Sequence, residues 1–288
     1  MKLGMSSYSL ANAIAKGEMS ILDVIQWTKD QGGEHIEIVP IGYTLTDNSQ
    51  LVADIVSKAE EVGVDISNYA IGADFLSGDE KAFQAEMERV KQEVDIANQL
   101  GVRRMRHDIS FKPPVEASME QFDNDLPKII EACQEIADYA KQYDIVTSIE
   151  NHGFYIQASD RINLIVSRVN RSNFGHTLDT GNFLCADENP IIAVKKCIDH
   201  ATMVHVKDFY IRPQSWHNPG EGWFSSAGGQ YLRGAITGHG DIELESVLKI
   251  IKDSGYDGYV SIEFEGMEEC KKASDISLKN VRNIWDQL

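Results

Sequence analysis

The segment ELESVLKIIKDSGYDGYVSIEF, residues 243–264, joins a helix-like stretch to a strand-like one. The first part predicts a helix that ends at Gly255, because glycine is common just past helix C-termini. The run Tyr259–Phe264 that follows is short and rich in aromatic and β-branched residues, which is typical of a strand. A helix that leads directly into a strand is half of a βαβ unit, so the segment predicts an α/β fold.

Strand-like runs of the same composition recur along the whole chain. They are Leu3–Tyr8, His35–Val39, Asp65–Ala70, Arg103–Ile109, Ile145–Asn151, Gly175–Asp179 and Met203–Lys207. Apolar residues at three- and four-residue steps predict helices between them. One helix begins after the N-cap signal SGDE and ends before Gly101, and another starts near Met119. Strands that alternate with helices predict right-handed βαβ units around a parallel sheet.

About eight such repeats in 288 residues favour one (β/α)8 TIM-barrel domain over residues 1–288, with its active site at the C-terminal ends of the strands. An open doubly wound sheet is the alternative, but KLGMSSYSL lacks the glycine-rich phosphate turn that such sheets usually carry. Residues 209–241 show neither helical nor strand period and contain two tryptophans. Loops of this length are often functional, so we expect this βα loop to be a lid.

The charge of the chain limits its partners. Forty-five acidic residues outnumber 27 basic ones, and the net charge of −18 disfavours nucleic acid and anionic membranes. No stretch approaches the roughly 18 apolar residues that a membrane span needs. The four cysteines form no C-x-x-C pair, which is typical of reduced thiols. With no signal-peptide pattern at the start of the sequence, these features predict a cytoplasmic protein.

Four strand-like runs end in side chains that bind metals. Glu150 ends TSIE, Asp179 ends HTLD, His205 lies in VHVKDF, and Glu263 lies in SIEFEG. Each follows apolar positions that should be buried, and an unpaired buried carboxylate is costly, so each needs a cationic or hydrogen-bonding partner. Each residue alone is more often structural, as a helix cap or an ion-pair partner. Together they form a ligand set that suits Mn²⁺, Mg²⁺, Co²⁺ or Zn²⁺.

The order of these motifs resembles the xylose-isomerase-like TIM barrels, the sugar phosphate isomerase/epimerase family. The motifs are E-N-H, L-D-T-G-N, H-V-K-D, G-H-G-D-I and Y-D-G-Y-V-S-I-E, and they are most specific in the second half of the chain. The resemblance implies a divalent metal on Glu150, Asp179, His205 and Glu263. In ketose 3-epimerases of this type the two glutamates are also the acid/base pair, acting on opposite faces of the sugar through an enediolate. The resemblance is also compatible with a homo-oligomer.

Six further polar residues near strand ends are candidates for substrate binding. They are Glu37, His107, His152, Asn182, Lys207 and His239. For some of them a structural role is the alternative: a salt bridge for Glu37, packing for His107, and pairing with Asp208 for Lys207. Asn182 departs from the histidine that ketose epimerases often have there, which weakens the assignment to that substrate class.

Other classes of protein compete with a sugar isomerase or epimerase. Inosose and 3-dehydroshikimate dehydratases use much the same metal site, and the sequence does not separate them from epimerases. Apurinic endonucleases share the barrel, but they need three zinc ions and a DNA groove. Asn182 and the negative charge disfavour that class. A metal-free barrel with a binding role would lack some of the four ligands, and all four are present.

Overall fold

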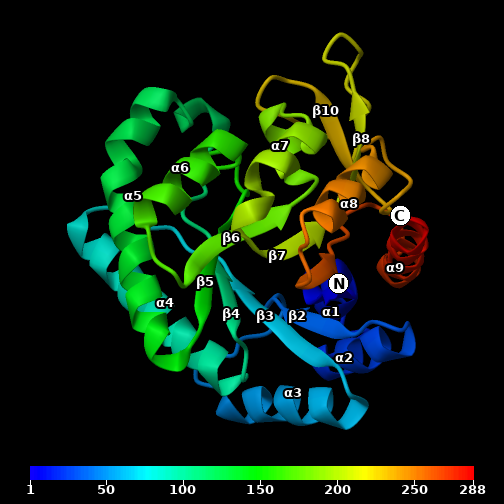
Figure 1. Ribbon diagram of the computed structural model, residues 1–288, viewed down its shortest axis with the longest axis horizontal. Helices are drawn as coiled ribbons and strands as arrows, with labels where there is room; N and C mark the ends of the chain where they lie inside the picture. The colour runs from blue at the N-terminus through cyan, green and yellow to red at the C-terminus, as the bar shows by residue number, and fades with distance from the viewer.

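A computed structural model describes residues 1–288 and forms a closed parallel barrel in the order β1-β11-β7-β6-β5-β4-β3-β2 (Figure 1). The strands are β1 Lys2–Ser6, β2 His35–Ile38, β3 Asp65–Ile71, β4 Arg104–His107, β5 Val146–Glu150, β6 Phe174–Asp179, β7 Ala201–Val206 and β11 Tyr259–Ile262. Every predicted strand is present, with bounds that differ by no more than two residues. Closure through β1 and β11 confirms the (β/α)8 barrel and excludes the open sheet.

Helices surround the barrel, and most of them connect one parallel strand to the next (Figure 1). They are α1 Ala11–Ala15, α2 Ile21–Asp30, α3 Ser49–Val62, α4 Glu80–Gln99, α5 Met119–Ala140, α6 Ser159–Val169, α7 Pro190–Cys197, α8 Leu244–Asp253 and α9 Cys270–Gln287. The predicted cap before α4 is present, since the side chain of Asp79 accepts a hydrogen bond from the backbone N–H of Ala82 at 3.0 Å. None of these helices has the length and apolar character that crossing a bilayer requires.

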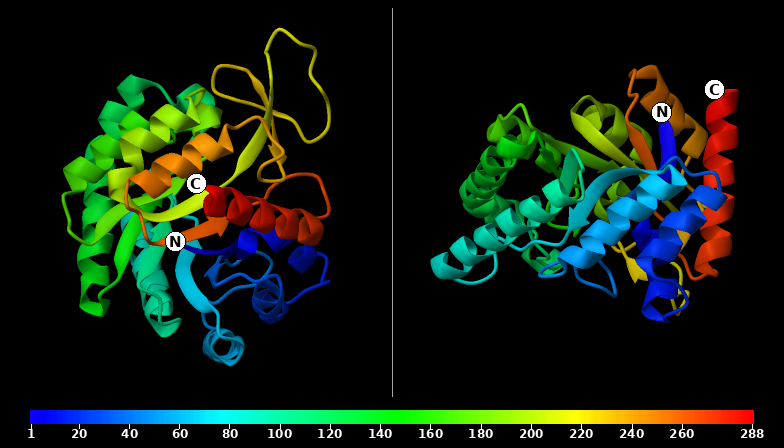
Figure 2. Two further views of the ribbon diagram at one scale, coloured as in Figure 1. Left: turned by 45° about the vertical axis from the view of Figure 1, so that its right-hand side comes forward. Right: turned by 90° about the horizontal axis from the view of Figure 1, so that it is seen from below.

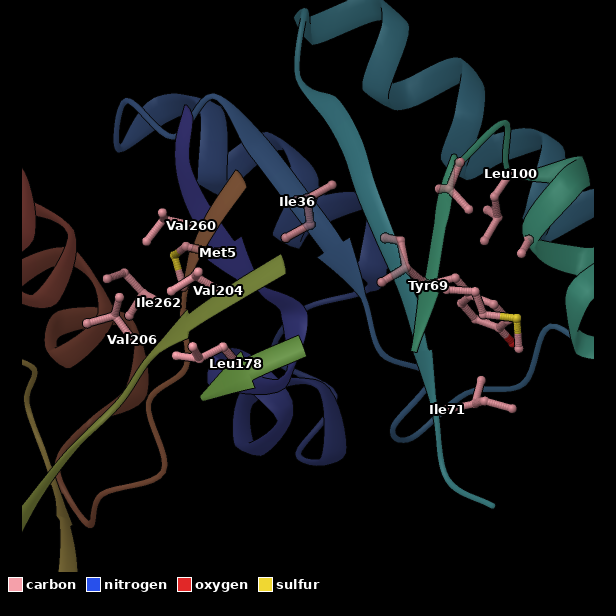
Figure 3. Close-up of a cluster of buried hydrophobic side chains, with 14 of the residues drawn as sticks. Met5, Ile36, Tyr69, Ile71, Leu100, Leu178, Val204, Val206, Val260 and Ile262 are labelled. Atoms are coloured by element: carbon pink, nitrogen blue, oxygen red, sulfur yellow. The ribbon is translucent and has the colours of Figure 1, made fainter. Parts of the chain in front are cut away.

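The apolar residues of the strands fix which polar residues face the barrel interior. Leu178, Val204 and Val260 are fully buried and belong to the large apolar core that includes residues of the helices (Figure 3). Burying such side chains stabilises the fold by about 1.5–3 kcal/mol each. Because side chains alternate along a strand, their neighbours Asp179 and His205 are held facing inward. The packing of the core thereby orients the candidate site.

Residues 209–241 are not irregular, and the prediction that they have no strand character is wrong. This region carries β8 Asp208–Arg212, β9 Phe224–Ser225 and β10 Tyr231–Ala235, which form an antiparallel sheet in the order β8-β10-β9. Its connections extend away from the barrel (Figure 2). The buried apolar side chains of this sheet are Phe209, Leu232 and Ala235, and the first two pack with Cys185. Both residues of β9 are exposed, so the region shows no sustained period of two.

The two tryptophans of this region are placed differently. Trp216 is 55% exposed. Trp223 lies near Arg212 and Arg233, whose guanidinium carbons are 5.5 and 5.7 Å from the ring centroid. No residue of the region lines the large cavity described below. The role of residues 209–241 as a lid therefore stays a prediction.

Asp208 ties this sheet to the barrel at the point where β7 ends. Its buried carboxylate accepts hydrogen bonds from the backbone N–H groups of Phe209, Gly238, Gly240 and Ile242, at 2.8 to 3.3 Å. A Cβ atom on Gly240 would lie 2.1 Å from Oδ1 of Asp208, so this close approach requires glycine. The two glycines next to His239 therefore have a backbone role, because their N–H groups bind Asp208. The side chain of His239 itself is exposed.

Candidate metal centre and active-site cavity

Four side chains from four neighbouring strands converge at the C-terminal end of the barrel. Glu150 is the last residue of β5, Asp179 the last of β6, His205 lies near the end of β7, and Glu263 directly follows β11. One ligand-type atom of each lies within 4.8 Å of those of the others, and all four residues are buried. The order β11-β7-β6-β5 places these strand ends side by side.

His205 presents one ring nitrogen to this cluster and the other to Glu37. Its Nδ1 is 3.6 Å from Oε1 of Glu150 and 3.6 Å from Oε1 of Glu263. Its Nε2 is 2.7 Å from Oε2 of Glu37, whose side chain is fully buried. Because a carboxylate only accepts, Nε2 carries the hydrogen, and in the neutral ring the lone pair of Nδ1 is directed to the cluster.

Unpartnered buried atoms show that the cluster fits a cation. Oε2 of Glu150, Oδ2 of Asp179 and Nδ1 of His205 are buried without a hydrogen-bond partner. The other oxygen of Asp179 is occupied, since it accepts from the backbone N–H groups of Gly181 and Asn182 at 2.7 and 2.8 Å. Carboxylate oxygens and an imidazole nitrogen are ligands for divalent metals, so these residues could hold such an ion.

Arg106 lies beside Glu150 and was not among the site residues predicted from the sequence. Its Nε is 2.9 Å from Oε2 of Glu150, although the N–H is not aligned for a hydrogen bond. Its Nη1 is 3.1 Å from Oδ2 of Asp108 and donates to the carbonyl of Ile71 at 3.0 Å. Alternation along β4 puts Arg106 and its neighbour His107 on opposite sides of the strand, but it does not tell which of these two polar residues faces the cavity.

Lys207 is the second cation of the site and lies beside Glu263. Its Nζ is 2.9 Å from Oε2 of Glu263, 3.4 Å from Oδ2 of Asp179 and 3.2 Å from Oε2 of Glu265. It also donates to Oδ1 of Asn182 at 3.2 Å, while Nδ2 of Asn182 donates to Oε1 of Glu150 at 3.1 Å. Asn182 thus links the two sides of the cluster, and Lys207 does not pair with Asp208.

The protonation of the cluster follows from these contacts. Burial opposes the charged forms, yet Arg106 and His205 hold the pKa of Glu150 well below its usual range. Lys207 and His205 likewise lower the pKa of Glu263 against the effect of burial. Burial raises the pKa of Asp179 to about 7, and the attraction of Lys207 only partly offsets it. Repulsion from Glu150 and Glu263 adds to this rise, which a bound cation would relieve.

The cluster opens into a cavity of about 440 Å³. One end is lined by Arg106, Glu150, Lys207, Glu263 and other polar residues of the strand ends. The other end is lined by the segment 39–46 after β2 and by residues of β3 and α4. The size is in the range of small-molecule binding sites.

The six residues predicted to bind substrate fall into two groups. Lys207 and His152 line the cavity, and Asn182 contacts Glu150 and Lys207 at its edge. Nδ1 of His152 is 3.1 Å from Oδ1 of Asp108. The structure does not bring the other three, Glu37, His107 and His239, into the cavity lining.

These three residues lie elsewhere for different physical reasons. Glu37 is buried behind His205. His107 is fully buried on the other side of β4, where its ring packs edge-on against Phe75 at 5.7 Å and its Nδ1 lies 2.9 Å from the carbonyl oxygen of Asp108. His239 is exposed in the turn that holds Asp208.

A closed barrel with a candidate metal centre at its strand ends defines this protein's class. Residues 25–284 match the model of the xylose isomerase-like TIM barrel family, and the chain belongs to that family. Among curated proteins it is similar to the inosose dehydratase of Clostridium botulinum (strain Eklund 17B / Type B), with 30% identity over 115 residues. The match covers 39% of this chain and 38% of that protein, and matches to further inosose dehydratases also span less than half of their length.

Solved structures share the fold over the whole chain. The IOLI protein, solved with a binding zinc atom, has a TM-score of 0.77 and 19% identity, and the match covers 100% of this chain and 99% of that one. The D-psicose 3-epimerase from Clostridium cellulolyticum H10, solved with D-tagatose, has a TM-score of 0.75 and 14% identity over 99% of both chains. At these identities the likeness is one of fold.

Proposed function

We propose that this protein is a divalent-metal-dependent enzyme that removes the proton α to the carbonyl of a small polyhydroxylated compound, with isomerisation or epimerisation as the outcome. The observation that carries the proposal is the convergence of Glu150, Asp179, His205 and Glu263 on one buried point at the mouth of the barrel. This end of a (β/α)8 barrel is where the chemistry of such enzymes is found.

The metal would be held by these four residues. Their unpartnered buried atoms support this assignment, and so does the zinc atom reported for the IOLI protein of the same fold. When bound, a divalent ion polarises a carbonyl and stabilises the negative charge that develops on its oxygen.

Glu150 and Glu263 are proposed as the acid/base pair. They come from β5 and β11, which are separated in the barrel by β6 and β7, so they approach the cavity from different sides. Both line the cavity, and each has its own cation: Arg106 beside Glu150, and Lys207 beside Glu263. One glutamate removes the α proton, and the other returns a proton to the opposite face of the same carbon or to its neighbour.

Three residues are proposed to bind substrate hydroxyl groups. His152 and Lys207 line the cavity, and Asn182 lies between Glu150 and Lys207. Tyr8, which also lines the cavity, offers a further hydroxyl, and burial raises its pKa to about 12, so it stays a hydrogen-bond donor near neutral pH.

Dehydration of an inosose-like substrate is the second candidate. Two observations favour it: the inosose dehydratases among the similar proteins, and the ammonium group of Lys207 at 2.9 Å from Glu263. Elimination begins with the same removal of an α proton, and it then needs a proton donor for the departing hydroxyl. Lys207 and His152 are the basic residues of the cavity that could supply that proton. His152, whose pKa Asp108 raises to about 8 against the effect of burial, is better matched to this role near neutral pH than Lys207, whose pKa the surrounding carboxylates hold well above its usual value.

Deuterium exchange tests the proposal. The metal-loaded protein is incubated in D2O with a panel of free ketoses and inososes, and the recovered compounds are analysed by NMR. Deuterium at the α carbon with an isomer or epimer as product supports the first candidate, and an unsaturated product supports dehydration. The proposal is contradicted if the protein binds no divalent metal, or if no compound of the panel exchanges its α proton for deuterium.

Two variants assign the chemistry to residues. Glu150→Gln and Glu263→Gln keep the shape of the side chain, and each should lower exchange by about 10²- to 10⁴-fold at saturating metal. Glu61→Gln, at a largely exposed site on α3, is the matched control and should exchange like the unaltered protein. Unchanged exchange in Glu150→Gln would remove Glu150 from the reaction.

A further inference from the structure

We infer that the substrate of this cavity is uncharged, so that a free polyhydroxylated ketone binds while its phosphate ester or a carboxylate analogue does not. The inference rests on the proposed function and narrows its substrate class. The observation behind it is that the cationic side chains of the cavity already lie beside carboxylates of the protein.

The arginine and lysine side chains that line the cavity are Arg89, Arg106 and Lys207, and both arginines lie beside carboxylates. A fourth basic residue of the lining, His152, has its Nδ1 3.1 Å from Oδ1 of Asp108. Arg106 is paired with Glu150 and Asp108. At the other end, Nε of Arg89 is 2.8 Å from Oε2 of Glu86, Nη1 is 3.3 Å from Oε1 of Glu93, and Nη2 donates to the carbonyl of Gly72 at 2.7 Å. Arg89 therefore keeps no free bidentate edge, which is the group that recognises phosphate or carboxylate. Each edge of Arg106 has one nitrogen 2.9 or 3.1 Å from the carboxylate of Glu150 or Asp108.

Lys207, the third of these cations, also lies among counter-charges. The carboxylates of Glu263 and Glu265 and the amide oxygen of Asn182 surround its ammonium at 2.9 to 3.2 Å. Asp179 lies at 3.4 Å as a further counter-charge. An anionic substrate group would have to displace one of these buried carboxylates.

The usual phosphate site of the fold is filled by acidic residues. In (β/α)8 barrels, phosphate is often bound by the loops after the seventh and eighth barrel strands and by a helix N-terminus nearby. The loop after β11 reads EFEGMEE over residues 263–269 and contains four glutamates. The last of them, Glu269, caps α9 by accepting from the backbone N–H groups of Lys271 and Lys272 at 3.1 and 2.8 Å. These N–H groups are therefore not available to a phosphate.

The overall charge leads to the same conclusion. Carboxylates outnumber cations along the cavity wall, where the acidic residues are Glu93, Asp108, Glu150, Glu263 and Glu265. Two of the three carboxylates of the candidate metal centre, Glu150 and Glu263, are already in this count, and Asp179 adds one more. Six carboxylates would then face the two charges of a divalent ion and the three of Arg89, Arg106 and Lys207. An anionic substrate group would add to the negative charge at the wall, and such juxtaposition of like charges disfavours binding.

Paired titrations test this inference. Calorimetry on the metal-loaded protein compares D-fructose with D-fructose 6-phosphate, D-tagatose with D-tagatose 6-phosphate, and scyllo-inosose with inorganic phosphate. The uncharged member of each pair should bind about a hundredfold more tightly. Tighter or equal binding of a phosphorylated sugar would overturn the inference.

A variant keeps the test decisive even where the free sugars bind weakly. Asp108→Asn removes the carboxylate 3.1 Å from Nη1 of Arg106, so it should raise affinity for D-fructose 6-phosphate by about tenfold, while Asp257→Asn on the exposed surface should not. Equal affinities in both variants would count against the inference.

Binding and exchange separate the two proposals. If uncharged compounds are preferred and none exchanges deuterium, the proposed reaction fails and the inferred charge selectivity stands. If only phosphorylated sugars exchange deuterium, the reaction stands and the charge selectivity fails.

Discussion

Oε2 of Glu37 lies 2.7 Å from Nε2 of His205, on the side of the imidazole ring that faces away from the carboxylate cluster. The two residues are far apart in the chain, and β2 and β7 are not neighbours in the barrel. A carboxylate in this position fixes both the tautomer and the orientation of a metal-binding histidine. Glu37 is therefore a positioning residue for His205.

Replacing Glu37 by glutamine should weaken metal binding without disrupting the barrel. The glutamine can still accept the hydrogen bond but no longer supplies the negative charge, so we expect the affinity for Mn²⁺ to fall by about ten- to hundredfold. Competition with a chromogenic chelator measures this directly and does not depend on turnover. Glu61→Gln is the matched control at an exposed site. Unaltered Mn²⁺ affinity in Glu37→Gln would show that the contact has no role in metal binding.

Lys207→Met should destabilise the metal-free protein and respond strongly to metal. Without the ammonium, the carboxylates of Glu263 and Asp179 stay buried with less compensation, and breaking such a pair costs about 3–5 kcal/mol. Saturating Mn²⁺ should recover much of this loss, because it supplies a new positive charge. Urea unfolding with and without Mn²⁺ measures both effects.

Lys249→Met is the control for this experiment, because Lys249 pairs with Asp253 on the exposed surface of α8. It should change the unfolding free energy by no more than about 0.5 kcal/mol. Similar losses in the two variants would contradict the structural account of Lys207.

Asp208→Asn should loosen the three-stranded sheet at its base. The asparagine amide would meet backbone N–H groups such as those of Gly238 and Gly240, leaving donors unpaired at a cost of about 1–3 kcal/mol. We expect faster proteolytic cleavage within residues 209–241, with Asp257→Asn as an exposed control. Cleavage at the unaltered rate would show that other contacts hold the sheet.

His35 should make stability fall on mild acidification. Its ring is fully buried between Oγ of Ser67 and the carbonyl oxygen of Val260, and burial lowers its pKa to about 4. The unfolded chain binds a proton below about pH 6.5 and the folded chain only below about pH 4. Its contribution is therefore complete above pH 6.5 and is lost as the pH falls towards 4, by about 3 kcal/mol.

Unfolding free energies at pH 7 and pH 5 test this. His35→Gln should show a smaller difference between the two pH values than the unaltered protein, whatever its absolute stability. His217→Gln, at an exposed position, should keep the full difference. An equal pH dependence in all three proteins would rule out His35 as the source.

The sequence patterns were sufficient to predict the barrel and to predict that Glu150, Asp179, His205 and Glu263 come together at its mouth. Glu150 and Asp179 each directly follow a buried apolar residue, Ile149 or Leu178, at the end of a strand, which makes their carboxylates conspicuous. The parallel arrangement then brings all such ends to the same side of the barrel. No knowledge of individual contacts is needed for this step.

The remaining residues depended on details that the sequence does not contain. In β4 both Arg106 and His107 are polar, and only the observed register decides that Arg106 faces the cavity. Glu37 meets His205 across the barrel interior, so its partner could not be inferred from its neighbours in the chain. The β8-β10-β9 sheet includes β9, whose two residues are both exposed, and shows no sustained alternating pattern.

The pairing of β1 with β11 has a consequence for how the protein is made. Residues 2–5 pair with residues 259–262, so the barrel closes only after these later residues have been synthesised. The contact that completes the fold therefore forms late in synthesis. Until then the sheet has two open edges, and the growing chain already holds Glu150, Asp179 and His205 but still lacks Glu263. A nascent or prematurely ended copy therefore has neither a closed barrel nor all four residues of the candidate metal centre.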